Sequence, residues 1–141
     1  MRERYEQKVN ALCKQYKTTD PFDLADKLGI FLLKTDLGQE IDGFYVHTRG
    51  RSFICLNSTL PEHLMRLALA HELGHAVLHP ELNSVWLKQH TLYSASKYEK
   101  EADMFALYLL MQGMDELPDS IGTLACNVGM DAGKLAKMLE R

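Results

Sequence analysis

The sequence predicts a single domain of the α+β class that is mostly helical and contains a small sheet of three strands. Two observations lead to this class. Apolar residues recur at helical spacing in several long segments, and three β-prone runs lie close together between residues 29 and 56. The length of 141 residues, with 46% hydrophobic and 25% charged residues, is typical of one globular domain. We therefore expect one core and one functional site.

The N-terminal segment is predicted to form two helices. Residues 3–17 place apolar side chains at helical spacing with charged residues between them, which indicates an amphipathic helix. Residues 21–28 form a second, short helix, because Pro21 suits the first turn of a helix and Gly29 suits the position just after the last turn.

The predicted sheet follows directly. Residues 29–35 form the first β-prone run. Residues 43–47 and 52–56 form two more, and the four residues 48–51 between them include Gly50, which is typical of a hairpin loop. Three strands are the expected minimum.

Helical periodicity returns in the second half of the chain. Residues 61–79 form the central helix, residues 80–96 lose the periodicity and predict an irregular connection, and residues 97–111 form an alanine- and leucine-rich helix. The tail, residues 118–141, is predicted to form two short helices, the second capped by Asp131. No repeat or linker divides the chain into separate domains.

Composition excludes several classes of protein. A net charge of −3 supplies no broad basic field, so direct binding to nucleic acid is not expected. The three cysteines lie far apart, which suits neither a disulfide framework nor a thiolate zinc site. The polar N-terminus is unlike a secretory signal, and no apolar run approaches the roughly 18 residues of a membrane span. We expect a cytoplasmic protein with reduced thiols and no membrane partner.

A candidate metal site lies in the central helix, in the segment HELGH. His71 and His75 are four residues apart, which places both imidazoles on one helix face, about 6 Å apart along the axis. Both can bind one zinc ion, because a catalytic zinc site uses three protein ligands and readily accepts neutral imidazole. Glu72 lies between them and can act as the catalytic base toward a water molecule activated by the metal.

The third ligand is expected from the following helix. Glu99 and Asp103 are four residues apart and share a face. Glu99 can bind the metal, while Asp103 can accept the second ring proton of a ligand histidine and so hold its orientation. Glu101 competes with Glu99 for the ligand position, and an acidic N-terminal turn that only favours the helix dipole is the structural alternative.

Three further residues are weaker candidates. His79 lies one turn beyond His75 on the same helix face. It could line the active-site cleft beside the metal, or it could interact with the C-terminus of the helix. Tyr93 and Tyr98 could stabilise a developing oxyanion, although packing is the alternative role of both.

The segment HELGH followed by EKEADMFALYLLM resembles the ImmA/IrrE family of zinc metallopeptidases, and the resemblance covers roughly residues 20–112. It implies a small gluzincin-like domain, with His71, His75 and Glu99 binding a single zinc ion and Glu72 acting as the base. Asp103 stands where many members have asparagine, and Gln112 where a proline is usual.

The resemblance also implies a biological role. Members commonly relieve repression by cutting a helix-turn-helix repressor of a phage or mobile element, so the implied activity is site-specific endopeptidase cleavage of such a repressor. The alternative is a protein that uses zinc only for structure and sequesters the repressor without cutting it.

Overall fold

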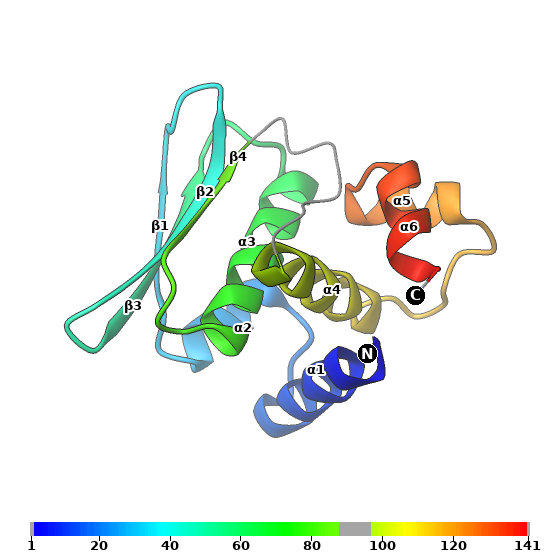
Figure 1. Cartoon of the computed structure of the whole chain (residues 1–141), viewed down its shortest axis with the longest axis horizontal. Helices are drawn as coiled ribbons and strands as arrows, with labels where there is room; N and C mark the ends of the chain where they lie inside the picture. The colour runs from blue at the N-terminus through cyan, green and yellow to red at the C-terminus, as the bar shows by residue number, and fades with distance from the viewer. Residues whose placement is uncertain (1, 88–96, 141) are drawn as a thin grey trace.

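The computed structural model describes residues 2–87 and 97–140, which form an α+β domain (Figure 1). The class is as predicted. Along the chain the elements are α1 (Arg2–Tyr16), α2 (Pro21–Lys27), β1 (Phe31–Thr35), β2 (Ile41–Thr48), β3 (Arg51–Asn57), α3 (Glu62–Leu78), β4 (Ser84–Leu87), α4 (Lys97–Gln112), α5 (Ile121–Val128) and α6 (Ala132–Leu139).

The sheet has four strands in the order β1-β3-β2-β4. β1 runs parallel to β3, with Phe31 opposite Phe53, whereas β2 is antiparallel to both β3 and β4. All three predicted strands are present. The fourth, β4, lies in the segment predicted to be an irregular connection. Its four residues are too few to show a periodicity, and its pairing partner β2 lies far away in the sequence.

The hairpin loop is shorter than the four residues predicted. β2 ends at Thr48 and β3 begins at Arg51, so the loop consists of Arg49 and Gly50. Both residues have positive φ, 51° and 75°, as the two central residues of a type I′ turn require. A type I′ turn matches the twist of the two strands, which explains why the pairing of β2 with β3 continues up to the turn.

α3 lies between the sheet and α4, and its contacts with both position the site (Figure 1). The main core contains fully buried residues from every one of these layers, among them Tyr45 of β2, Ile54 of β3, Leu69 of α3 and Phe105 of α4. α2 packs on α3, and α1 packs on α4.

The two C-terminal helices pack with α4 around a second apolar cluster (Figure 1). Ser120 caps the start of α5 and Gly129 caps its end, where a φ of 82° favours glycine. As predicted, Asp131 caps α6: its carboxylate accepts a hydrogen bond from the backbone N–H of Lys134 at 3.0 Å. This turn directs the first residues of α6 toward α4.

Among the described residues, no helix has the length and apolar character needed to cross a membrane.

Candidate metal centre

The HELGH segment lies in the buried half of α3. His71 and Glu72 are fully buried and His75 is 2% exposed. One potential ligand atom from each of these three side chains lies within 4.8 Å of the others. The two imidazole rings meet edge to face, with their centroids 4.9 Å apart. A single face of one helix therefore gathers two ring nitrogens and a carboxylate.

α4 places the carboxylate of Glu99 against both rings. Its Oε2 lies 2.9 Å from Nε2 of His71, and its Oε1 lies 2.9 Å from Nε2 of His75. Two nitrogen donors and one carboxylate from two helices thus converge on the same point. Because imidazole nitrogen and carboxylate oxygen are both ligands that zinc accepts, this donor set fits the metal.

Glu101 lies away from this point, although it is only two residues from Glu99. Its Oε1 is 3.0 Å from Nε2 of His79, and its Oε2 accepts a hydrogen bond from the hydroxyl of Tyr5 at 2.7 Å. Between the two glutamates, Glu99 is the one that contacts both His71 and His75.

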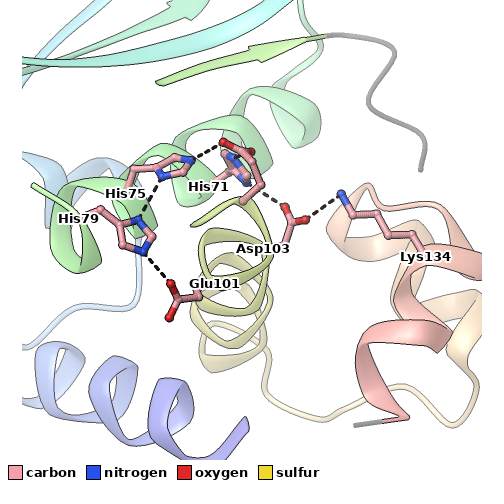
Figure 2. A network of polar contacts seen from close by, with 7 residues as sticks. His71, His75, His79, Glu101, Asp103 and Lys134 are labelled. Atoms are coloured by element: carbon pink, nitrogen blue, oxygen red, sulfur yellow. Dashed lines mark hydrogen bonds and ion pairs between the residues drawn. The ribbon is translucent and has the colours of Figure 1, made fainter. Parts of the chain in front are cut away.

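Each of the two histidines has a further polar contact through Nδ1 (Figure 2). Nδ1 of His71 lies 2.9 Å from Oδ1 of Asp103. Since an ionised carboxylate can only accept, Nδ1 carries the proton, and Nε2 is the nitrogen that a metal would use. The other oxygen of Asp103, Oδ2, lies 3.2 Å from Nζ of Lys134 in α6.

A second contact path begins at His75, whose Nδ1 lies 3.4 Å from Nδ1 of His79. His79 in turn contacts Glu101, and Glu101 contacts Tyr5 of α1. A neutral His79 with its proton on Nε2 satisfies the whole path, because its Nδ1 then accepts from His75 while its Nε2 donates to Glu101. His79 is only 8% exposed.

Of the two tyrosine candidates for the oxyanion, the structure describes the position of Tyr98 alone. Tyr98 is half exposed, and its ring meets His79 edge to face at 4.8 Å between centroids. Tyr93 lies outside the described residues. A role for either hydroxyl at an oxyanion stays a prediction.

The electrostatics of the metal-free site are dominated by His71 and the two carboxylates around it. Burial disfavours the charged imidazole, but hydrogen bonds to Asp103 and Glu99 outweigh burial and raise the pKa of His71 to about 10. Burial tends to raise the pKa of Glu99, yet the hydrogen bonds from His71 and His75 outweigh burial and hold this pKa well below its usual range. A metal ion and the proton on Nε2 of His71 therefore compete for the same nitrogen.

Two glycines allow the surrounding elements to approach the site. A Cβ added to Gly74 would lie 3.0 Å from both the α-carbon and the carbonyl oxygen of Ala102. On β2, a Cβ added to Gly43 would lie 3.0 Å from the carbonyl oxygen of Cys55 and 3.8 Å from Cγ of Glu72. The first contact joins α3 to α4, and the second sets the sheet against Glu72.

Sequence reasoning did not find Lys134 or Tyr5. Neither residue was predicted to lie at the site: Tyr5 belongs to the apolar stripe of segment 3–17, and Lys134 lies in the predicted tail helix that Asp131 caps. The signal that could have found Lys134 is its position three residues after the capping residue Asp131, which orients the first turn of α6.

The sequence profile of the peptidase family described as IrrE N-terminal-like domain matches residues 25–119 of the chain. The chain belongs to this family. The matched range includes the whole of α3 and α4, and hence the HELGH segment and Glu99. It excludes α1, α5 and α6.

Two curated proteins resemble the chain in sequence. "Uncharacterized immunity region protein 2" of Bacillus phage phi105 is 42% identical over 103 residues, which cover 73% of this chain and 65% of that protein. "Metallopeptidase ImmA" of Bacillus subtilis (strain 168) is 31% identical over 106 residues, which cover 74% of this chain and 61% of that protein. The chain thus spans a little under two thirds of the length of these relatives. No solved structure matches it significantly.

Proposed function

We propose that this protein is a zinc metalloendopeptidase in which His71, His75 and Glu99 hold a single zinc ion. The observation that carries the proposal is the convergence of the Nε2 atoms of His71 and His75 on the two oxygens of Glu99, each at 2.9 Å. Membership of a peptidase family and the likeness to a named metallopeptidase support it.

Glu72 is the proposed catalytic base. Bound zinc would supply a Lewis acid for the scissile carbonyl and lower the pKa of a water molecule. Glu72 is adjacent in sequence to His71, and its carboxylate belongs to the same buried group of potential ligand atoms. From this position it takes a proton from the attacking water and delivers it to the leaving amine.

Asp103 orients one ligand. Its Oδ1 accepts the proton of His71 Nδ1, which keeps the imidazole in the tautomer with Nε2 directed at Glu99. Asparagine could accept the same hydrogen bond, but a carboxylate accepts it more strongly because the acceptor is charged.

The proposed substrate is a helix-turn-helix repressor of a phage or mobile element. Support comes from the relative named for a phage immunity region and from the relationship to ImmA. Direct recognition of nucleic acid is not part of the proposal, because the net charge of the whole chain is −3.

Glu72→Gln tests the mechanism. The purified variant should bind zinc as the wild type does, but should cleave a purified helix-turn-helix repressor substrate about 10²–10⁴-fold more slowly. Glu62→Gln is the matched control, since Glu62 lies on the same helix with a side chain that is 83% exposed. Cleavage by Glu72→Gln at the rate of the control would disprove the assignment of the base.

The same assay separates cleavage from sequestration. Under the proposal, full-length repressor disappears, two fragments accumulate, and a chelator prevents both. A repressor that leaves its operator while remaining full length would instead support the non-proteolytic alternative.

A further inference from the structure

Lys134 of α6 is a buried cation that the catalytic scheme does not use. It is 6% exposed, and its Nζ lies 3.2 Å from Oδ2 of Asp103, whose side chain is 1% exposed. Asp103 contacts His71 through its other oxygen (Figure 2). We propose that Lys134 is a positioning residue for the metal site and acts through Asp103 on His71. The inference rests on the proposed binding of zinc.

The position of Lys134 is set by the C-terminal helices. Asp131 caps the first turn of α6 through the backbone of Lys134, and the next residue, Leu135, is fully buried in the second apolar cluster. Met138, one turn later, is 1% exposed in the same cluster. Because both ends of this short helix are held, the Lys134 side chain enters the site with a defined direction. The family match ends at residue 119, so this cation comes from a segment outside it.

The carboxylate of Asp103 needs partners on both oxygens. A buried carboxylate is costly unless its charge is compensated and its oxygens accept hydrogen bonds. Lys134 supplies the countercharge on the Oδ2 side, with its Nζ 3.2 Å away, which restrains the rotation of the carboxylate and keeps Oδ1 toward Nδ1 of His71. Without Lys134, the carboxylate can rotate or draw in water, and His71 loses its fixed orientation.

The test measures the zinc dissociation constant of the full-length protein by competition with a chromophoric chelator. Lys134→Met should raise this constant about 10–100-fold, the usual effect of losing an outer contact of a ligand histidine. Lys137→Met is the matched control, because Lys137 is exposed on the same helix, and it should leave the constant unchanged within about twofold. Circular dichroism of the metal-free variants checks that they are folded. If Lys134→Met does not fold, Lys134→Gln replaces it and should show a similar loss.

A double variant separates positioning from a general structural effect. In the Asp103→Asn background, Lys134→Met should change the zinc dissociation constant by less than about threefold. The reason is that Lys134 acts on His71 through the carboxylate of Asp103, which this background lacks. An equal loss in both backgrounds, or wild-type affinity in Lys134→Met, would overturn the inference. If the wild-type protein itself bound no zinc, the proposed metal site would be wrong as well, so the two failures are distinguishable.

Discussion

Gly74 of α3 faces Ala102 of α4 so closely that an added Cβ would lie 3.0 Å from the Ala102 α-carbon. This contact is made by the glycine of HELGH itself. It lets the backbones of the two helices approach, which brings Glu99 within 2.9 Å of His71 and His75. The glycine thus contributes to the candidate metal site through packing rather than through chemistry.

Gly74→Ala is expected to force α3 and α4 apart. The atoms that the new methyl group would meet are mostly backbone, which cannot move aside as a flexible side chain can. Overpacking of this kind should lower the free energy of unfolding by about 1–3 kcal/mol, and zinc affinity should fall with it. Urea unfolding of the metal-free protein measures the first effect, and chelator competition measures the second.

Gly122→Ala is the control for that substitution. Gly122 lies in α5, and a Cβ there would meet only Oγ of Ser120, at 4.0 Å. Helix propensity predicts a gain of up to about 1 kcal/mol. Equal stability of the Gly74 and Gly122 variants would show that the close approach of α3 and α4 is not required.

Asn57→Asp should destabilise the loop that precedes β2. Asn57 is fully buried, and its Nδ2 donates hydrogen bonds to the carbonyl oxygens of Gly38 and Ile41, both at 2.8 Å. A carboxylate cannot donate, so both carbonyls would lose their donor and face a negative charge. The expected loss in the free energy of unfolding is at least about 2 kcal/mol. Asn127→Asp, at an exposed position, should cost less than about 1 kcal/mol, and a similar cost at both positions would contradict the role of the Nδ2 contacts.

Tyr5→Phe tests the contact path that begins at His75. The substitution removes the hydroxyl that donates to Oε2 of Glu101 at 2.7 Å and leaves a buried carboxylate oxygen without that donor. We expect a loss of about 1–3 kcal/mol in the free energy of unfolding. Zinc affinity should change less than in Lys134→Met, because Glu101 reaches His75 only through His79. Tyr16→Phe, on the same helix, is the control. Wild-type stability of Tyr5→Phe would show that the hydroxyl contributes nothing to this path.

The three cysteines should differ in their rates of alkylation. The thiolate is the reactive form, and burial raises the pKa of both Cys13 and Cys55, so less thiolate is present at a given pH than for an ordinary thiol. Cys126 is exposed. At pH 8, mass spectrometry should show one rapid modification at Cys126, with the other two slow and accelerating as the pH rises. In denaturant all three should react at similar rates, and rapid native labelling of Cys13 or Cys55 would show that the core opens there.

Much of the architecture could be predicted because it depends on local sequence. Apolar periodicity located α1, α3 and α4, and the segments around Pro21, Gly50 and Asp131 carried the signals of helix starts and a turn. β4 could not be predicted, since a strand of four residues shows no period and forms through its pairing with β2. The loop of the hairpin was overestimated because the boundaries of strands depend on where pairing ends.

The sequence by itself determined which residues could bind a metal. Helix geometry places His71 and His75 on one face, and the acidic start of the following helix made Glu99 and Glu101 candidates for the third position. Only the tertiary structure shows how their contacts differ: Glu99 contacts both histidines, whereas Glu101 contacts His79 and Tyr5. Tyr5 lies 96 residues from Glu101 in the chain. Contacts such as this one and that of Lys134 with Asp103 arise from the packing of α1 and α6 on α4, which leaves no periodic pattern in the sequence.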